Sequence, residues 1–376
     1  MNSGKIREVC LVFLKLGFIG FGGPAAHIAL MEEEVVNKRK WMTHEHFLDL
    51  IGATNLIPGP NSTEMTMHCG HERAGVPGLF LAGICFIFPA ALITTLFAWL
   101  YAQYGSLPAV EPFLYGIKPA IIAIVLNAIY KLGQKALKNW QLGVIGLAVV
   151  VVTLLGVNEI YALLGAGILV ILLVEGKGLL TNKKLSFFAP LVFLAVPTTV
   201  SPSYGRLFFT FLKIGATLFG SGYVLVAYLQ AEFIDKLHWL TQQQLIDAIA
   251  VGQFTPGPLF STATFIGYQV GGLWGAVVAT VGIFLPAFFF VLLLNPYVSK
   301  LRKSKVMGAF LDGVNIGAVG VMITATMQLS ANVLIDWKTL VIGLISLLLI
   351  FIWKKLNATW IVLGSALAGY LLAFIN

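Results

Sequence analysis

Two pairs of motifs place glycine and proline inside long apolar stretches of the sequence. Gly-Phe-Gly-Gly-Pro at 20–24 has a counterpart in Leu-Phe-Gly-Ser-Gly at 218–222, and Pro-Gly-Pro occurs at 58–60 and again at 256–258. Glycine permits close backbone approach and proline suits a first helical turn, so each motif could end one half-helix and begin another. The free N–H groups of such a helix start bind anions. Close helix packing through small residues is the structural alternative.

Uncharged polar side chains surround both Pro-Gly-Pro motifs. Amides and hydroxyls can replace the hydration shell of an ion without carrying a fixed charge. The predicted substrate-binding residues are Asn55, Asn61, Ser62, Thr63, Gln253, Thr255, Ser261 and Thr262, together with Gly22, Gly23, Gly59, Gly220, Ser221 and Gly257 in the breaks. The predicted helix-breaking prolines are Pro24, Pro58, Pro60, Pro256 and Pro258.

Two lysines lie within apolar segments. Lys15 and Lys213 precede Gly22 and Gly220, respectively, by seven residues. This spacing places each lysine on the helical face of its glycine break, about 10 Å away along the axis. A cation inside a membrane segment is costly and is therefore a functional hypothesis, here as a substrate-binding attractor of anions. Snorkelling of the ammonium to a nearby interface is the alternative.

Glu64 follows the first Pro-Gly-Pro motif, and its carboxyl is the predicted site for a coupling proton. Thr262 occupies the same position in the second copy, so the carboxylate is not a symmetric requirement. A structural role is the alternative, because Asn61 at a helix N-cap with Glu64 three residues later has the pattern of a capping box.

Metal, cofactor and enzyme chemistry are not indicated. His68, Cys69 and His71 lack the spacing of a common metal site, and Cys10, Cys69 and Cys85 form neither a CxxC pair nor a disulfide framework. The sequence has no GxxxxGK[ST] loop, no HExxH and no Ser-His-Asp order. We therefore expect a protein that is not an enzyme, with no cofactor, no metal and no catalytic residue.

The composition predicts a multi-pass membrane protein. Of the 376 residues, 58% are hydrophobic and 11% charged, against roughly 25% charged in an average soluble domain. The net charge of +8 does not indicate nucleic-acid binding, because most cations lie in short runs between apolar stretches. Apolar segments long enough to span a bilayer are expected near 8–30, 47–67, 77–102, 111–130, 140–157, 159–175, 207–230, 245–269, 272–295, 308–330, 338–353 and 358–375.

The second half of the chain repeats the first half. A displacement of 198 residues aligns Lys15 with Lys213, Trp41 with Trp239 and the two Pro-Gly-Pro motifs with each other. Two homologous halves are typical of secondary transporters. We expect an N-terminal membrane domain over 1–186, a linker over 187–203 and a C-terminal membrane domain over 204–376.

The Lys and Arg residues of the loops predict that the two halves have opposite orientations. In the first half they follow the fourth segment, at 131–138, whereas in the second half they follow the third and fifth segments, at 300–305 and 354–355. Since Lys and Arg accumulate on the cytoplasmic side, this pattern predicts an inverted repeat.

An inverted repeat requires an odd number of crossings between equivalent points. We expect an all-α fold with about five crossings and one broken or re-entrant helix in each half, because Pro-Gly-Pro breaks a helix. This arrangement puts both termini outside and Lys38-Arg39-Lys40 inside. The alternative has thirteen crossings, with 185–200 as a central span, and Lys5 and Arg7 would favour it.

With these motifs in register, the chain resembles the two-domain, long-chain type of the chromate ion transporter family over nearly its whole length. The resemblance rests on Phe13-Leu-Lys-Leu-Gly-Phe-Ile-Gly-Phe-Gly-Gly-Pro24, on Leu56-Ile-Pro-Gly-Pro-Asn-Ser-Thr-Glu64, on Phe211-Leu-Lys-Ile-Gly215, on the run from Gln253 to Gly267 and on Ala279-Thr-Val-Gly-Ile-Phe-Leu-Pro286. The departures lie mainly in the second half, where Ser221-Gly222 replaces Gly-Pro and Leu259-Phe260 replaces Asn-Ser.

The resemblance implies a bacterial inner-membrane secondary transporter of chromate, associated with efflux and resistance. Alternating access at a mid-membrane anion site is the expected mechanism, with the lipid bilayer and an inorganic oxyanion as partners and with a homodimer left open. A transporter of sulfate or another anion on the same fold shares every feature above. A membrane-embedded enzyme would need clustered acids, histidines or a metal site, which the sequence does not offer.

Overall fold

The structure is a computed structural model of the 376-residue chain. It describes residues 3–105, 107, 110–179, 201–220, 222–294, 304–353 and 358–373, with the backbone alone for 175–179. Over these residues the secondary structure is helical, with no strand. The prediction of an all-helical fold is therefore confirmed for these residues.

The helices form two matching series. The first series is α1 (Ser3–Ile19), α2 (Pro24–Met31), the π-helical η1 (Glu32–Lys38), α3 (His44–Thr54), α4 (Asn61–Tyr104), α5 (Glu111–Ala136), α6 (Trp140–Leu154) and α7 (Glu159–Leu179). The second is α8 (Tyr204–Thr217), η3 (Gly222–Val224), α9 (Leu225–Leu229), the π-helical η4 (Gln230–Lys236), α10 (Gln242–Phe254), η5 (Leu259–Ser261), α11 (Thr262–Leu294), α13 (Lys305–Val333), α14 (Trp337–Ile352) and α15 (Ala358–Leu372).

The repeat extends to single backbone angles. Both α4 and α11 contain a reversal, at Gly75 with φ 65° and ψ −154° and at Gly272 with φ 61° and ψ −152°. The non-glycine residues with positive φ are Lys40 and His238, which also occupy equivalent positions. Since L side chains rarely adopt these angles, their recurrence shows that the two halves share one local fold.

The first element of each half is a helical hairpin. In the first half, Lys15 Nζ on α1 lies 2.8 Å from Glu34 Oε1 on η1. Farther from the break at 20–23, the Trp41 indole N–H donates to Glu8 Oε1 at 3.2 Å. The chain therefore turns at the break and returns along α1.

The sequence predicts one apolar segment over 8–30, and the structure divides it at the glycines. Gly22 and Gly23 adopt φ values of 104° and 79°. Pro24 is the first residue of α2, where its missing N–H leaves no lost helical hydrogen bond. A long apolar stretch therefore yields two short helical arms instead of one continuous helix.

The Pro-Gly-Pro motif lies at the tip of a second hairpin. Its arms are α3 and the part of α4 before the reversal, 61–73, and His46 Nε2 lies 3.4 Å from Glu72 Oε2 where the arms end. At the reversal the backbones of Gly70 and Gly78 touch, so a Cβ on either would overlap the other residue. From there, 76–104 continues as a long helix.

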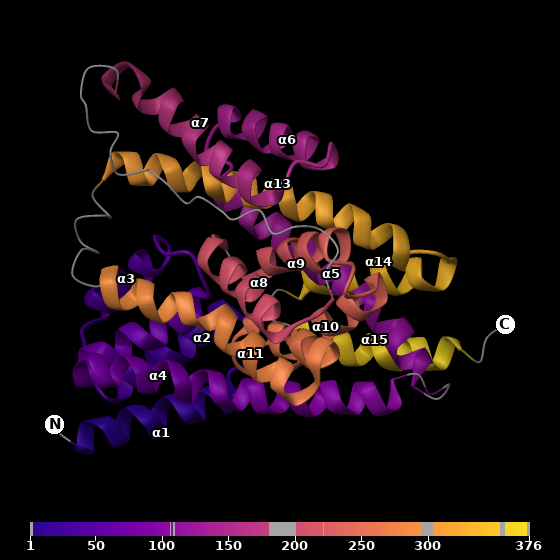
Figure 1. Cartoon of the computed structure of the whole chain (residues 1–376), viewed down its shortest axis with the longest axis horizontal. Coiled ribbons are helices and arrows are strands. Elements are labelled where there is room, and N and C mark those ends of the chain that lie inside the picture. Colours follow the sequence, from indigo (N-terminus) through magenta and orange to yellow (C-terminus); the bar gives the residue numbers. More distant parts are fainter. Residues whose placement is uncertain are drawn as a thin grey trace.

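Among the described residues, four helices are long and apolar enough to cross a membrane: Asn61–Tyr104, Glu111–Ala136, Leu259–Leu294 and Lys305–Val333. Shorter apolar helices occur at Trp140–Leu154, Glu159–Val174, Trp337–Ile352 and Ala358–Leu372. In Figure 1, α1 begins at the left-hand end of the molecule and α15 ends at the right-hand end.

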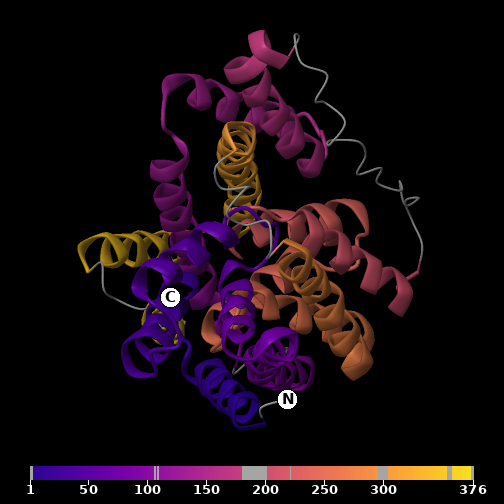
Figure 2. The ribbon, with the colours of Figure 1, turned by 90° about the vertical axis from the view of Figure 1, so that its left-hand side faces the viewer.

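The long helices of each half pack against helices of the other half. α5 packs against α14 and α15, whereas α13 packs against α6 and α7, which cover it in Figures 1 and 2. Small residues allow the close crossings: a Cβ on Gly116 would lie 2.7 Å from Gly369 Cα, and one on Gly313 would lie 2.7 Å from Gly167 Cα. The two halves are thus interlocked by a reciprocal exchange of helices.

Candidate functional site

The four breaks meet in pairs, and each pair joins one half to the other. The N–H of Gly59, in the first Pro-Gly-Pro motif, donates to Leu218 O in the second glycine break at 2.7 Å. The N–H of Gly257, in the second Pro-Gly-Pro motif, donates to Gly20 O in the first glycine break at 2.7 Å. The tips of the four hairpins therefore meet in two pairs, and each pair joins the two halves inside the molecule.

Backbone geometry explains why glycine occupies these tips. The φ angles are 140° at Gly59, 101° at Gly220 and 90° at Gly257, all in the region that favours glycine. At Gly257 a Cβ would also lie 2.8 Å from Ala90 Cβ on α4. The positive φ angle and the nearby Ala90 Cβ therefore both favour glycine at position 257.

The predicted polar residues divide into bonded and unbonded groups. Thr255 and Thr262 donate to helix carbonyls of Val251 and Leu259, both at 2.8 Å, so their protons are already used. Asn61 Nδ2 donates to Asn55 Oδ1 at 2.9 Å. The buried polar atoms without a hydrogen-bond partner at the breaks are Thr63 Oγ1, Glu64 Oε1 and Oε2, Gln253 Nε2 and Ser261 Oγ.

These side-chain atoms near the breaks have hydrogen-bonding capacity that no protein group uses. A buried polar group without a partner is costly, and native structures usually supply one. Ser62 is buried on the same helical turn as Thr63. Ser221 lies outside the described residues.

A cavity of about 320 Å³ lies between Asn55, the second glycine break and the loop after α5. Its lining includes Asn55 and Gly220, one from a break of each half, and Asn315 of α13. Lys135 and Lys138 also line it, and Lys138 Nζ lies 2.6 Å from Asp312 Oδ1. The cavity therefore brings the Asn55 amide and the backbone of Gly220 next to cationic side chains.

Glu64 is buried beneath the first Pro-Gly-Pro motif. Its side chain has no exposed surface, and a Cβ on Gly59 would overlap its Oε1. The capping-box interpretation is wrong: Pro60 is the N-cap of α4, Asn61 is the first helical residue, and no side-chain cap bond forms. The carboxyl therefore has no structural bond that explains its presence.

Within the described part of the chain, no three His, Cys, Asp or Glu side chains form a group that could hold a metal ion.

The comparisons with known proteins agree with this architecture. A sequence model of the chromate transporter family matches residues 7–171 and 205–370, one match for each half. The chain belongs to the chromate transporter family. No solved structure matches it.

Relatives within the chromate transporter family align over nearly the whole chain. A chromate transport protein of Cupriavidus metallidurans is 34% identical over 97% of this chain and 92% of its own length. A probable chromate transport protein of Synechococcus elongatus is 33% identical over 97% of this chain and 95% of its own. A chromate transport protein of Pseudomonas aeruginosa is 31% identical over 96% of this chain and 90% of its own. This member is therefore a multi-pass membrane protein of a transporter family.

In this chromate transporter family member, Lys15 and Lys213 have carboxylate partners that no sequence motif indicates. Lys15 pairs with Glu34 at 2.8 Å, and Lys213 pairs with Glu232 at the equivalent position. Each glutamate is the third residue of a π-helical turn, and its side chain is 6% or 4% exposed. The repeat itself held the signal, because Glu34 and Glu232 are also 198 residues apart.

Asn315 is another site residue that the sequence analysis missed. It lies within an apolar helix and lines the cavity beside Gly220. Its equivalent 197 residues earlier is Lys118, so the two halves carry different polar groups at this position. No motif marks Asn315, and only the packing of α13 against the second glycine break identifies it.

Proposed function

We propose that the protein exports chromate, or a closely related tetrahedral oxyanion, by alternating access at the junction of the four breaks. The observation that carries this proposal is the pair of cross-half hydrogen bonds, Gly59 to Leu218 and Gly257 to Gly20, in a member of the chromate transporter family. Movement of one half against the other would change both contacts. The relatives named above as chromate transport proteins support chromate as the substrate.

The chemistry of the junction suits an oxyanion. A tetrahedral dianion offers only hydrogen-bond acceptors, so its site must supply donors. Thr63, Gln253 and Ser261 hold buried atoms without partners that can donate, and the helix that begins at Asn61 presents free N–H groups. We propose that the remaining predicted binding residues, including Lys15 and Lys213, also contribute to the anion site.

The charge of the substrate favours export over uptake. Moving a dianion outward across a 100 mV potential, interior negative, releases about 4.6 kcal/mol, which is twice the roughly 2.3 kcal/mol per charge. Export therefore needs no ATP, whereas uptake would need coupled cations. The cavity beside Lys135 and Lys138 is the proposed loading path from the cytoplasm.

Opposite orientation of the halves is part of the proposal. At one end of the molecule Arg73 pairs with Glu8 at 2.6 Å, and at the other the Tyr115 hydroxyl donates to Asp336 Oδ2 at 2.5 Å. The start of α1 lies at the first end, whereas the start of α8 lies near Gly271, to whose carbonyl Tyr204 donates. Gln269, two residues before Gly271, donates to Ala98 O, which lies toward the other end of α4 from Arg73. Equivalent helices thus begin at opposite ends of the molecule.

The Lys/Arg-rich end is the proposed cytoplasmic side. It carries Lys5, Arg7, Lys38, Arg39, Lys40, Arg73, Lys135, Lys138 and Lys305, and the opposite end carries Arg206, Lys236 and Lys338. By the positive-inside rule, the start of α1 is cytoplasmic, which differs from the expectation that both termini lie outside. We infer two re-entrant hairpins in each half, followed by spanning helices. The central span of the alternative, 185–200, lies outside the described residues.

Cysteine accessibility tests this topology. In a variant whose three native cysteines are replaced, we expect Lys135→Cys and Lys305→Cys to react only with reagents on the cytoplasmic side. His238→Cys and Lys338→Cys are expected to react only from outside, because they lie at the opposite end. Labelling of Lys135→Cys and Lys305→Cys from different sides would contradict the inverted arrangement.

Glu64 remains the proposed proton-coupling residue. Its buried carboxyl lies next to the first Pro-Gly-Pro motif and has no hydrogen-bond partner. An ionised carboxylate there would be costly and would repel an oxyanion. A carboxyl that takes up or releases a proton during the cycle avoids both costs.

Flux of labelled chromate into everted vesicles tests the proposed function. We expect uptake that saturates, that rises with an imposed potential, positive inside, and that exceeds uptake in vesicles without the protein. Glu64→Gln is expected to retain flux but lose any dependence on a pH gradient. Potential-independent flux equal to that of empty vesicles would refute the transport proposal, and sulfate that competes fully at equal concentration would favour a general oxyanion carrier.

We also propose a bacterial inner-membrane location, sulfate as a second substrate and assembly into a homodimer. The division into domains at 1–186 and 204–376 also remains a prediction, since α5 and α13 pack against helices of the opposite half.

A further inference from the structure

His27 is a buried histidine that follows the first glycine break. The residue is 2% exposed, and its Nε2 lies 2.8 Å from Gly20 O. Because a carbonyl oxygen can only accept, Nε2 carries the ring proton and donates it. The ring also meets the Phe86 ring edge to face, with centroids 5.4 Å apart. The polar contact of this histidine is therefore with the break itself.

The carbonyl that His27 contacts is also one end of a cross-half hydrogen bond. Gly20 O accepts the N–H of Gly257 at 2.7 Å, so two donors share this oxygen. The second ring nitrogen of His27, Nδ1, is buried without a hydrogen-bond partner. Since a buried polar atom without a partner is costly, an apolar residue would suit this place better unless the bond to Gly20 O mattered.

The other cross-half bond has no histidine at the equivalent position. Leu218, whose carbonyl accepts the N–H of Gly59, is the equivalent of Gly20 in the repeat. The equivalent of His27 is Leu225, whose side chain has no donor. The two cross-half bonds are therefore alike in their backbone groups and differ in the side chain that follows the acceptor.

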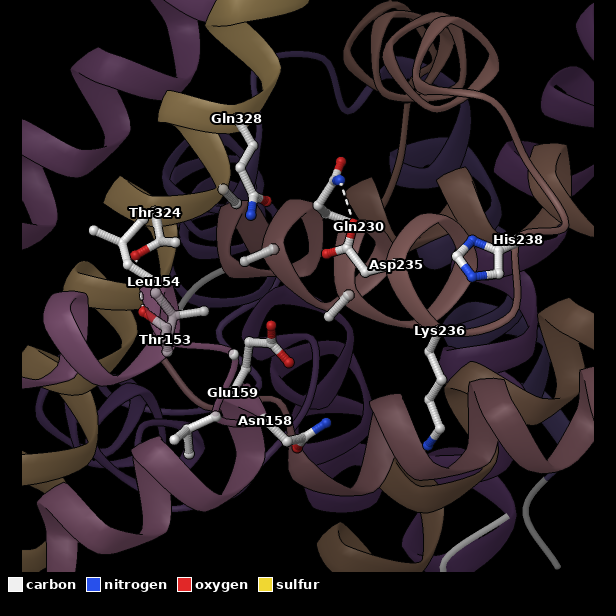
Figure 3. A pocket seen from close by; sticks show the side chains of 16 residues that line it. Thr153, Leu154, Asn158, Glu159, Gln230, Asp235, Lys236, His238, Thr324 and Gln328 are labelled. Atoms are coloured by element: carbon white, nitrogen blue, oxygen red, sulfur yellow. Dashed lines mark hydrogen bonds between the residues drawn. The ribbon is translucent and has the colours of Figure 1, made fainter. Parts of the chain in front are cut away.

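The hairpins that carry the two acceptors are also enclosed to different extents. In the second half, all five residues of α9 are buried, and η3 and α9 pack against α13. This arm continues into η4, which faces α7 across a cavity of about 460 Å³ lined by Gln230 and Glu159 among others (Figure 3). In α2 the buried residues are His27 and Met31, and α2 packs against α1, η1 and α4 of its own half. The first hairpin is therefore the less enclosed of the two.

We propose that His27 is a positioning residue that makes the contact between Gly257 and Gly20 the one that opens when the two halves move. When the Gly257 N–H departs, the His27 N–H still satisfies the Gly20 carbonyl. Without this second donor, opening would leave a buried carbonyl without a partner, which opposes opening. The contact between Gly59 and Leu218 stays closed more of the time. A role in transport rests on the proposed function, whereas the preferential opening does not.

Amide hydrogen exchange of the full-length protein in lipid nanodiscs measures the opening of each contact without any oxyanion present. Gly59 and Gly257 each lie between two prolines, which have no amide proton. Each glycine amide is therefore isolated, and the identical neighbours give both the same intrinsic exchange rate. Fragmentation in the mass spectrometer resolves the two amides. We expect Gly257 to exchange faster than Gly59 in the wild type.

Variants of His27 separate the proposed role from that of a structural anchor. His27→Leu introduces the residue of the second half and removes the donor. We expect the Gly257 amide to exchange about tenfold more slowly, equivalent to about 1.4 kcal/mol, and the Gly59 amide to be unchanged. His27→Gln, whose amide N–H reaches about as far as Nε2, is expected to restore the wild-type rate. An anchor predicts the opposite sign, because its loss would loosen the hairpin and speed exchange at Gly257.

The matched control is His46→Leu, which removes a histidine from the start of α3 and is expected to change neither amide. Thermal unfolding of each variant identifies those that fail to fold. If His27→Leu fails to fold, His27→Asn replaces it, because its shorter amide does not reach Gly20 O. Faster or unchanged exchange at Gly257 in the folded variant would overturn the inference, and so would equal exchange of the two glycines in the wild type.

Chromate flux tests the connection to transport. His27→Leu is expected to lower kcat by about threefold or more and to leave KM within about twofold, because His27 acts on the junction and not on the substrate. A change in KM alone would contradict the positioning role. The expected exchange pattern in a protein without chromate flux would support the preferential opening and refute the transport proposal instead.

Discussion

Gly257→Ala is expected to abolish anion transport. The new Cβ would lie 2.8 Å from Ala90 Cβ, and the residue would keep a φ of 90° that L side chains rarely adopt. Left-handed strain costs about 1–2 kcal/mol and overpacking about 1–3 kcal/mol. Relief of either would displace the N–H that donates to Gly20 O, the bond that joins two breaks. Since each 1.4 kcal/mol is about tenfold, we expect flux to fall by more than tenfold.

The control variants separate strain from crowding. Gly220→Ala has φ 101° but no heavy atom nearer than 3.6 Å, so only the strain applies and a smaller loss is expected. Gly364→Ala, in α15 with nothing within 4 Å, is expected to retain full flux. Gly146→Ala is a poor control, because its Cβ would lie 2.9 Å from Ile316 Cγ1. Wild-type flux in well-expressed Gly257→Ala would show that the junction does not control transport.

Lys213→Gln is expected to destabilise the protein much more than Lys15→Gln. Removing Lys213 leaves Glu232, whose side chain is 4% exposed, with only Lys236 at 3.9 Å, and breaking a buried pair costs about 3–5 kcal/mol. Lys15 is 54% exposed, and its partner Glu34 keeps Arg39 Nη1 at 2.5 Å. Thermal unfolding in detergent, measured beside chromate affinity, tests the difference.

The double variant Lys213→Gln with Glu232→Gln separates the two roles of this lysine. If the ion pair is structural, the double variant recovers much of the stability and binds chromate as well as its folded fraction allows. If Lys213 attracts the anion directly, as the sequence alone suggests, both variants lose affinity while unfolding at the wild-type temperature. The second outcome would contradict the structural role.

Local backbone chemistry made the breaks predictable from the sequence. Gly22, Gly59 and Gly257 depart from helical geometry because glycine tolerates positive φ and the neighbouring prolines lack an N–H donor. Both properties depend only on residue type. The repeat could also be predicted from the sequence, because equivalent residues recur at a nearly constant displacement.

The direction of the chain after each break was not predictable. An apolar stretch such as 8–30 has the same composition whether it crosses the membrane or turns back. The pairing of Lys15 with Glu34 is the contact that identifies a return. In the sequence Lys15 looks like a lone cation, because its partner Glu34 lies 19 residues away on a π-helical turn.

The sequence by itself determined that this chain is a duplicated, all-helical membrane protein of the chromate transporter family. It also determined the positions of four helix breaks, which glycine and proline mark. Only the tertiary structure decided which breaks meet, which helices are exchanged and which carbonyl His27 contacts. The physical reason is that helix formation and breaking depend on neighbouring residues. Partner choice depends on matched small surfaces, such as Gly116 against Gly369, between residues far apart in the chain.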